Sequence, residues 1–363
     1  VAAPARVDFG GGWTDTPPYS IERGGVVLNA AVTLRGRRPI IAEASWLEEP
    51  ALTLVSRDID ETLRPEVAGE VLDYRNPADP FALVKAALVL KGVVPAGTDP
   101  AAPLSALLAR LPGGVQLATQ TAIPRGSGLG TSSIMAGAVL TALDRLLGQA
   151  DQAAESDAEA LFDQVLCLEQ MMTTGGGWQD QAGGLTGGVK LVTSRPGLPQ
   201  QLRLTPLSPA AQDALRRRLL LVYTGQQRLA KNLLRAVMGR WMARDPEMVW
   251  ILGEIGRLAV AMRDALEAGD VDGFGALLSE HWQLNKRMDP GCTNPFIDDL
   301  FTFLQPYISG GKLAGAGGGG FAIVVARHAQ ATAELAGALN RRYAQTPLAL
   351  WEAAISAQGV SVD

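Results

Sequence analysis

Glycine is gathered into short clusters along this sequence. The chain has 41 glycines in 363 residues, with clusters at residues 10–12, 24–25, 126–130, 175–177, 183–188 and 310–320. Glycine has no Cβ, so a cluster lets the backbone turn sharply and come close to a ligand. The segments between the clusters carry strand-like and helix-like patterns. The sequence therefore predicts a regular framework whose loops contact a ligand.

Strand-like and helix-like segments do not alternate strictly. The segments that predict strands are 25–34, 38–44, 51–56, 115–121, 187–193, 218–225, 319–326 and 348–355. Those that predict helices are 132–148, 153–172, three or four segments between 226 and 306, and 329–343. This arrangement favours an α+β fold over a doubly wound parallel sheet. The pattern changes near residue 205, and the length fits two domains, so we predict domains at 1–205 and 206–363.

The composition excludes several classes of function. A net charge of −5 provides no basic face for nucleic acid or an anionic membrane, so an anionic ligand must be held by local groups. The two cysteines fit neither a disulfide framework nor a zinc motif, and no apolar run has the length of a membrane helix. We therefore expect a cytoplasmic protein in a reducing compartment. His281 and His328 are interpreted as packing or surface residues, which disfavours a histidine-based catalytic triad.

The sequence PRGSGLGTSS, at residues 124–133, is the strongest local motif. Three alternating glycines precede three hydroxyl residues at a predicted helix start, which would direct backbone N–H groups and the positive helix end at one point. This suits a phosphate, and one hydroxyl could reach a magnesium ion. The alternative is a glycine turn with a serine N-cap. The motif exceeds what a cap needs, so we favour a phosphate loop, although it is neither a Walker A loop nor a dinucleotide fingerprint.

Two carboxylates flank the triple glycine at 175–177. Glu169 lies near the end of a predicted helix, and Asp180 follows the glycines within the polar sequence WQDQ. A glycine hinge would let both face one pocket, with one on magnesium and one near an attacking hydroxyl. The alternative for Glu169 is a solvated helix residue. If the hinge interpretation holds, alanine at Gly176 should reduce activity more than stability.

The start of the chain repeats this pattern. In ARVDFGGGWTDTPPYS, Arg6 and Asp8 precede three glycines, and Asp15 follows Trp13 by two positions, as Asp180 follows Trp178. An indole against a sugar face, with a carboxylate on the sugar hydroxyls, is one interpretation. A structured turn capped by Asp15 is the other.

The motifs together resemble the GHMP small-molecule kinases, and within them the L-fucose kinases most. The matching phrases are GGWTDTPPYS, GGVVLNAAV, GRRPI, PRGSGLGTSSIMAG, LEQMMTTGGGWQDQAGG, LLLVYTGQQRLAKNLL, PGCTNP and LAGAGGGGF. They are spread over most of the chain. The heptose 7-phosphate kinases share GGGxTD and QDQ but usually lack the tryptophans at positions 13 and 178.

The resemblance implies a fold and a reaction. The fold would be the GHMP kinase fold, an N-terminal S5-domain-2-like α/β domain and a C-terminal ferredoxin-like domain with the active site between them. The reaction would be phosphorylation of the anomeric hydroxyl of L-fucose by ATP, giving L-fucose 1-phosphate for salvage toward GDP-fucose. The alternatives are a D-glycero-D-manno-heptose 7-phosphate kinase or another sugar-1-kinase, and a non-catalytic sugar sensor. A glycosidase with paired Asp15 and Asp180 ranks last, because it would leave the phosphate loop without a role.

The resemblance also implies residue roles. ATP phosphates would lie on Pro124, Gly126, Ser127, Gly128, Leu129, Gly130, Thr131, Ser132 and Ser133. Ser132 and Glu169 would hold Mg²⁺, although the family often has alanine at position 133, which leaves the metal-binding hydroxyl open among residues 131–133. Asp180 would act as base or orient the reacting hydroxyl, and Arg6 would stabilise charge on the phosphoryl group. Sugar contacts are expected from Trp13, Thr14, Asp15, Trp178, Gln179, Gly317 and Gly318.

The resemblance leaves the oligomeric state open but suggests a partner. Many L-fucose kinases carry a long N-terminal region, in some cases a nucleotidylyltransferase that makes GDP-fucose. The chain begins with valine and not with methionine. We therefore expect it to be a segment of a longer protein, and the alternative is a kinase that stands alone. The expected partners are thus ATP, a small sugar and a fucose-1-phosphate nucleotidylyltransferase, without nucleic acid or membrane.

Overall fold

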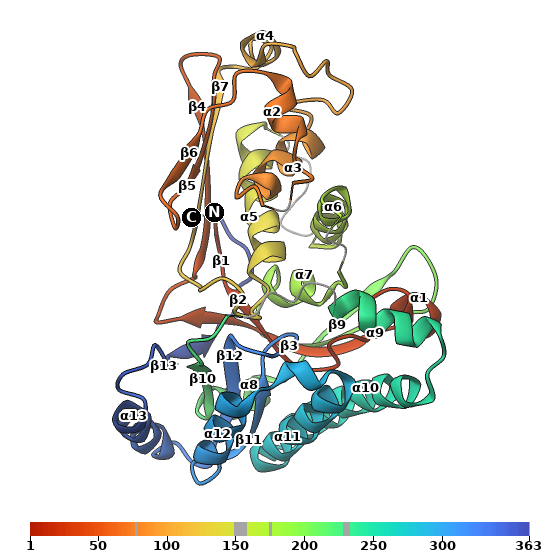
Figure 1. The fold of residues 1–363 in the computed structure, drawn as a ribbon, viewed down its shortest axis with the longest axis vertical. Coiled ribbons are helices and arrows are strands. Elements are labelled where there is room, and N and C mark those ends of the chain that lie inside the picture. Colours follow the sequence, from red (N-terminus) through yellow and green to blue (C-terminus); the bar gives the residue numbers. More distant parts are fainter. Residues whose placement is uncertain (77, 149–157, 174–175, 228–232, 363) are drawn as a thin grey trace.

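The structure is a computed structural model that describes residues 1–363 except 77, 149–157, 174–175, 228–232 and 363. Three β-sheets and their covering helices form an elongated molecule (Figure 1). The upper part of Figure 1 contains the first sheet, and the lower part contains the third, with the second between them. The site described below lies where these parts meet.

The first sheet is covered by helices on one face. Its strand order is β1 (Ala2–Ala3), β4 (Ile40–Leu47), β7 (Gly114–Thr121), β5 (Leu52–Ser56) and β6 (Glu61–Leu63). The long helix α5 (Thr131–Leu146) packs against β4, and α3 (Ala82–Leu90) and α6 (Ala158–Met171) pack outside it (Figure 1). The short helices α2 (Ala68–Leu72) and α4 (Leu104–Leu108) lie at the upper end. The glycine loop that precedes α5 therefore emerges at the lower end of this layer.

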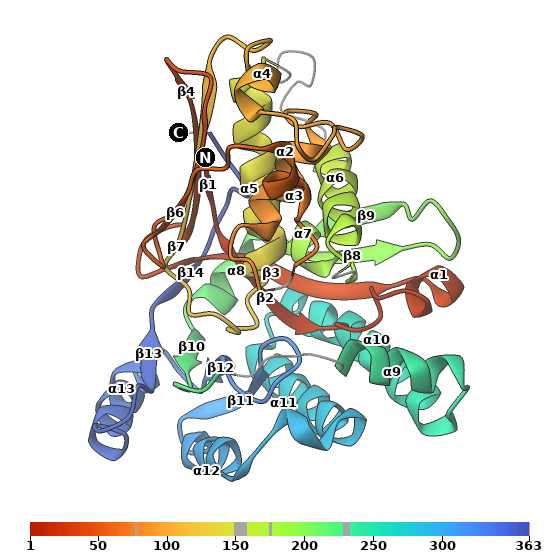
Figure 2. The same ribbon diagram turned by 45° about the horizontal axis from the view of Figure 1, so that its top comes forward.

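The second sheet carries the N-terminal motif. It has the order β14 (Ala353–Ile355), β3 (Val26–Leu34), β8 (Val189–Ser194) and β9 (Leu202–Pro206), and β2 (Ala5–Gly10) also pairs with β3. Both β2 and the centre of β3 are buried, which explains the apolar run in β3. The helices here are α1 (Tyr19–Arg23), α7 (Gln179–Gly184) and α8 (Pro209–Arg216). Helix α7 packs on β2, β3 and α5, and Figure 2 shows it beside the lower part of α5.

The third sheet is antiparallel and is covered by the C-terminal helices. Its order is β11 (Ile308–Leu313), β12 (Phe321–Ala326), β10 (Leu219–Tyr223) and β13 (Ala349–Trp351). The helices are α9 (Leu233–Met242), α10 (Pro246–Glu267), α11 (Val271–Met288), α12 (Pro295–Leu304) and α13 (Ala331–Arg342), with a 3₁₀ turn, η2, at Pro290–Cys292. Helix α10 packs on both α11 and β3 and so joins the third sheet to the second.

Helix starts in this region follow ordinary capping chemistry. The Asp245 carboxylate accepts from the N–H groups of Glu247 and Met248, 3.0 and 3.4 Å away, with Pro246 at the first helical position of α10. Asn294 caps α12 in the same way, also before a proline. These signals explain why helices were predictable between 226 and 306.

The α+β prediction is confirmed, and the main strands and helices lie where the patterns placed them. Residues 153–157 of the predicted helix 153–172 lie outside the described residues, and α6 begins at Ala158. Several elements were not predicted, among them α3, β9 and β11, and two of these missed elements, strand β2 and helix α7, carry candidate site residues. Within the described ranges, no helix has both the length and the apolar character needed to cross a bilayer.

Candidate active site

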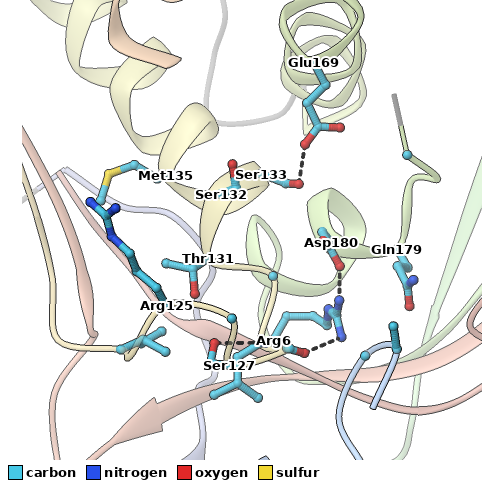
Figure 3. Close-up of a pocket in the computed structure, with 18 of the residues that line it drawn as sticks. Arg6, Arg125, Ser127, Thr131, Ser132, Ser133, Met135, Glu169, Gln179 and Asp180 are labelled. Carbon is cyan, nitrogen blue, oxygen red and sulfur yellow. Dashed lines mark hydrogen bonds and ion pairs between the residues drawn. The ribbon is translucent and has the colours of Figure 1, made fainter. Parts of the chain in front are cut away.

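A cavity of about 620 Å³ lies at the meeting point of the three sheets. Its walls come from β2, the 125–130 loop, the first turn of α5, α6, the start of α7, and the 315–316 segment (Figure 3). Segments far apart in the sequence thus form one cavity, and the glycine clusters at 10–12, 126–130, 175–177 and 310–320 all reach it. The clusters at 24–25 and 183–188 are not among the lining residues, so four of the six clusters have the position that a ligand-contacting loop needs.

The 126–130 loop ends in a glycine cap. Gly126, Gly128 and Gly130 have φ values of 70°, 76° and 72°, a left-handed conformation that other residues adopt only with strain. Gly130 is the N-cap of α5, and no side chain caps the helix. The expectation that hydroxyl residues cap this helix is therefore wrong. Thr131, Ser132 and Ser133 instead occupy the first turn and line the cavity.

The two glycine loops are in direct contact. A Cβ on Gly128 would lie 2.6 Å from the Ala314 carbonyl oxygen, and one on Gly320 would lie 2.4 Å from that of Ser127. Residues 315 and 316 reach the cavity wall. Gly317 and Gly318 lie beside Cys292 instead, outside the lining residues.

The predicted catalytic pair forms an ion pair at the centre of the site. Arg6 Nη2 donates to Asp180 Oδ1, and Arg6 Nη1 donates to the Gly128 carbonyl oxygen at 3.3 Å (Figure 3). The exposed fraction is 4% for the Arg6 side chain and 28% for that of Asp180. A Cβ on Gly183 of α7 would lie 2.2 Å from Arg6 Cγ, so α7 packs closely on this arginine. Arg6 therefore connects the glycine loop to the carboxylate of α7.

Glu169 contacts the first turn of α5 through Ser133. Its Oε1 accepts from the Ser133 hydroxyl (Figure 3). Its Oε2 accepts from Gln181 Nε2 at 3.0 Å. Ser132 is exposed at the cavity wall and is not the serine that bonds Glu169. Burial raises the pKa of Glu169 to about 7, and the nearby charge of Asp180 adds to this. Glu169 is a half-buried residue that lines the cavity and bonds Ser133 and Gln181, so its interpretation as a solvated helix residue is wrong.

The raised pKa of Glu169 predicts that the ligand-free protein loses stability as the pH rises. In the unfolded chain the carboxyl ionises near pH 4.3, whereas in the folded chain its pKa is about 7. Between these two pH values the folded state binds more protons than the unfolded state. The stability that Glu169 contributes is therefore fully present below about pH 4 and is lost as the pH rises through about 7. Denaturant unfolding between pH 4 and 8 should show a smaller loss in Glu169→Gln. An identical pH slope in both proteins would contradict this assignment.

Asp15 holds two loops together behind the cavity wall. Its Oδ1 accepts from Trp13 N at 3.1 Å and its Oδ2 from Gln179 N at 3.0 Å. The side chain is fully buried, and burial, together with the charges of Asp180 and Asp8, raises the pKa of Asp15 to about 7. Asp15 therefore ties the N-terminal turn to the start of α7, the helix that carries Asp180.

The closest approach in the triple-glycine segment falls on Gly177 and not on Gly176. A Cβ on Gly177 would lie 1.9 Å from Asp15 Oδ2, whereas one on Gly176 would have no neighbour within 4 Å. Just before them, Thr173 has the left-handed φ of 59°. Gly175 lies outside the described residues. The closest backbone packing in this segment therefore falls on Gly177, and the expected loss of activity on alanine substitution at Gly176, which lines the cavity, stays a prediction.

Alanine at Gly177 is expected to lower both stability and activity. The added methyl group would displace the Asp15 carboxylate, with a cost of about 1–3 kcal/mol in unfolding free energy. Alanine at Gly176 is the matched control and should change the unfolding free energy by less than about 0.5 kcal/mol. Thermal or denaturant unfolding of both variants provides the comparison. Equal unfolding free energies for the two variants would disprove the role of Gly177.

The remaining predicted site residues divide into two groups. Trp13 and Gln179 line the cavity. Thr14, Asp15 and Trp178 are buried behind its wall and, like Pro124, are not among the lining residues. The Thr14 hydroxyl donates to the Gly11 carbonyl oxygen at 2.7 Å, so it stabilises the N-terminal turn.

Three charged residues that line the cavity, Asp8, Asp58 and Arg125, were not predicted as site residues. Asp8 lies two positions after Arg6 on β2 and lines the same cavity. Strand alternation would have placed both side chains on one face if β2 had been predicted. Arg125 lies inside the quoted glycine motif and lines the cavity near Met135 (Figure 3).

Comparison with known proteins matches two segments of the chain to family models. The family model described as GHMP kinases N terminal domain matches residues 100–188, and the one described as GHMP kinases C terminal matches residues 262–345. A crystal structure of Lactococcus lactis galactokinase complexed with galactose is similar, with a TM-score of 0.72 and 18% identity over 99% of this chain and 94% of that chain. This likeness shows that the fold is shared.

Two curated proteins are similar over 92% of this chain. One, from Arabidopsis thaliana, is named bifunctional fucokinase/GDP-fucose pyrophosphorylase and is 42% identical over 337 residues, 30% of its own length. The other, from Bacteroides fragilis, is named L-fucokinase/L-fucose-1-P guanylyltransferase and is 36% identical over 336 residues, 35% of its length. The chain thus spans about a third of the length of these relatives. With its N- and C-terminal family domains and the matching fold, the chain belongs to the GHMP kinase family.

Proposed function

We propose that this chain is an L-fucose kinase that transfers the γ-phosphoryl group of ATP to the anomeric hydroxyl of L-fucose. The observation that carries the proposal is the contact of Asp180, through Arg6, with the glycine loop. A carboxylate, a guanidinium and a phosphate-binding loop at one point are the groups that phosphoryl transfer to a hydroxyl needs. The two relatives whose names include fucokinase support L-fucose as the acceptor.

The proposed roles follow from this arrangement. The N–H groups and positive helix end of residues 126–133 bind the ATP phosphates. Arg6 stabilises negative charge on the transferred group. Asp180 accepts the proton of the anomeric hydroxyl or orients that hydroxyl toward the phosphoryl group. Gly130 packs against both side chains of this ion pair, since a Cβ there would lie 3.2 Å from Arg6 Nε and 3.3 Å from Asp180 Cγ.

The residues present fit a magnesium ion. Magnesium prefers oxygen ligands and commonly takes one or two carboxylates together with substrate phosphates. Glu169 supplies the carboxylate, Ser133 and Ser132 supply hydroxyls, and Thr131 Oγ1 is buried without a hydrogen-bond partner among the described residues. In the part of the chain that the structure describes, no group of three or more His, Cys, Asp or Glu side chains is placed to hold a metal ion by itself. We propose that Glu169 and one of these hydroxyls hold Mg²⁺, which would neutralise charge on the ATP phosphates.

The two ends of the cavity suit different parts of the substrates. Leu83, Val84 and Ile123 form an apolar wall, which we assign to the adenine ring. Trp13 and Gln179 line the other part and would contact the sugar directly. Thr14, Asp15, Trp178, Gly317 and Gly318 would support that part from behind the wall.

The wider setting is proposed from the same relatives. Their names pair a fucokinase with an enzyme that forms or cleaves GDP-fucose, so the expected partner is a fucose-1-phosphate nucleotidylyltransferase. We place the protein in the cytoplasm, where ATP is available. The division into domains at 1–205 and 206–363 stays a prediction.

ATP consumption against a panel of acceptors tests the function. The panel is L-fucose, D-galactose, D-arabinose, D-mannose and D-sedoheptulose 7-phosphate, with Mg²⁺ present. The expected result is the highest kcat/KM for L-fucose. A preference for the heptose phosphate would replace the proposal by the heptose kinase alternative. No turnover, with calorimetric binding of L-fucose, would favour a sugar sensor.

A further inference from the structure

A second carboxylate in the cavity has no role in the proposed reaction. Asp8 lies on β2 two positions after Arg6, so both side chains project from the same face of the strand. The Asp8 residue is 3% exposed and lines the cavity. Its Oδ2 accepts from Lys312 Nζ at 3.1 Å, and its Oδ1 has no hydrogen-bond partner among the described residues. One oxygen of a buried carboxylate on the cavity wall therefore has no donor among the described residues.

Lys312 fixes the Asp8 carboxylate in this position. The lysine, on β11, is fully buried and donates to Asp8 Oδ2 and to the Phe9 carbonyl oxygen at 3.2 Å. Burial opposes ionisation of Asp8, but the charges of Lys312 and Arg6 hold the pKa of Asp8 below its ordinary value. On the other side, burial and Lys312 lower the pKa of His281 to about 3, so this imidazole is neutral. Asp8 is thus an ionised acceptor with a fixed orientation.

Gln179, which lines the same cavity as Asp8, also carries a hydrogen-bond acceptor for which the described residues supply no donor. Gln179 Oε1 is buried without a partner among the described residues. A Cβ on Gly12 would lie 2.6 Å from Asp8 Oδ2 and 3.1 Å from Gln179 Oε1, so the missing side chain keeps this wall open. A buried acceptor without a donor costs about 1–3 kcal/mol. Two such acceptors, on two residues that line one cavity and both border Gly12, match a ligand that presents several hydroxyl donors, as a sugar does.

We propose that Asp8 Oδ1 accepts a hydrogen bond from a sugar hydroxyl other than the reacting one, and that Asp8 thereby determines which sugars the cavity accepts. Lys312 is the positioning residue for this contact. The inference rests on the proposed sugar kinase function. Alternate residues of a strand are about 7 Å apart, so Asp8 lies one sugar-ring width from Arg6, whose guanidinium holds Asp180. The Asp8 contact is therefore separate from the anomeric hydroxyl.

The test compares deoxy sugars in the wild type and in Asp8→Asn. The substrates are the panel sugar that the wild type uses best and its analogues that each lack one non-anomeric hydroxyl. The wild type should discriminate against one analogue by on the order of 10²-fold or more in kcat/KM, because a site built for a hydroxyl rejects its absence. In Asp8→Asn, Lys312 would draw the amide oxygen toward itself and leave the NH₂ group at the cavity. In this variant the ratio of kcat/KM for the parent sugar to kcat/KM for that one analogue should fall at least tenfold. The corresponding ratios for the other analogues should keep their wild-type values.

The controls separate this role from a structural one. A ratio of kcat/KM values measured on one preparation does not depend on the fraction of folded enzyme. Lys312→Met should weaken discrimination against the same analogue. Asp299→Asn removes a carboxylate paired with a surface cation, Arg342 at 2.8 Å, and should keep every ratio at the wild-type value.

The outcomes distinguish the two proposals. If Asp8→Asn lowers kcat/KM by one factor for the parent sugar and every analogue, the specificity role is overturned. If the best panel sugar is not L-fucose, the proposed function falls, while the ratios for that sugar and its analogues still decide the role of Asp8.

Discussion

An Asp180→Asn variant is expected to lose about 10²- to 10⁴-fold in kcat with little change in stability. An asparagine side chain can neither accept the proton of the reacting hydroxyl nor carry the charge that pairs with Arg6. The Asp180 side chain is 28% exposed, and its isosteric replacement leaves α7 packed on β2 and β3. Steady-state turnover with L-fucose and thermal unfolding on the same preparation measure the two effects.

A matched change in the same cavity is the control for Asp180. Asp58 lines the cavity, is exposed and has no contact with the Arg6 guanidinium among the described hydrogen bonds and ion pairs. Asp58→Asn should therefore lose far less activity than Asp180→Asn. Comparable kcat values for Asp180→Asn and the wild type would remove Asp180 from the reaction. An equal loss in both variants would indicate a general effect of cavity charge.

The framework was predictable because burial on both faces leaves a clear sequence pattern. Strands β3, β10 and β12 read as continuous apolar runs, and each lies inside the fold with neighbours on both edges. Helices α10 and α12 start with an acidic or amide cap followed by proline. In these segments local preference and tertiary packing agree, so pattern and structure coincide.

Strand β2 and helix α7 were missed because tertiary packing, not local preference, stabilises them. Helix α7 has the sequence QDQAGG, and two glycines in six residues disfavour an isolated helix. It forms where it packs on β2, β3 and α5. Strand β2 interrupts its alternation at Gly10, where its register with β3 shifts. The side chains that these two elements bring together, Arg6 and Asp180, were nevertheless predicted as a pair from the family resemblance.

The sequence located the site but not the contacts of individual oxygens. It brought Glu169 to the first turn of α5, yet only the structure shows that Ser133 is the hydroxyl in contact. Asp15 was expected to face the sugar, whereas its two oxygens accept from the backbone of two loops. The Ser133–Glu169 contact joins positions 36 residues apart, and the contact of Asp15 with Gln179 joins positions 164 apart. Such contacts depend on how the segments pack together, which spacing in the sequence does not report.

Removing the arginine is expected to have an effect as large as removing the carboxylate. Arg6→Gln should lower kcat by about 10³-fold or more, because an arginine that stabilises a transferring phosphoryl group contributes effects of this size. The change also leaves Asp180 without its cation and the Gly128 carbonyl oxygen without its donor. Unlike Asp180→Asn, it should lower the melting temperature, because the Arg6 side chain is buried between β2 and α7. Turnover and thermal unfolding of Arg6→Gln test both statements.

The double variant shows whether the two residues act together. Arg6 and Asp180 touch, so their effects should not multiply. We expect Arg6→Gln/Asp180→Asn to lose no more than about tenfold in kcat beyond the worse single variant, since losing either partner already disrupts the pair. A loss equal to the product of the two single losses would mean that Arg6 acts on the phosphoryl group independently of Asp180. The ion pair would then be a packing contact, and Asp180 would depend on α7 alone for its position.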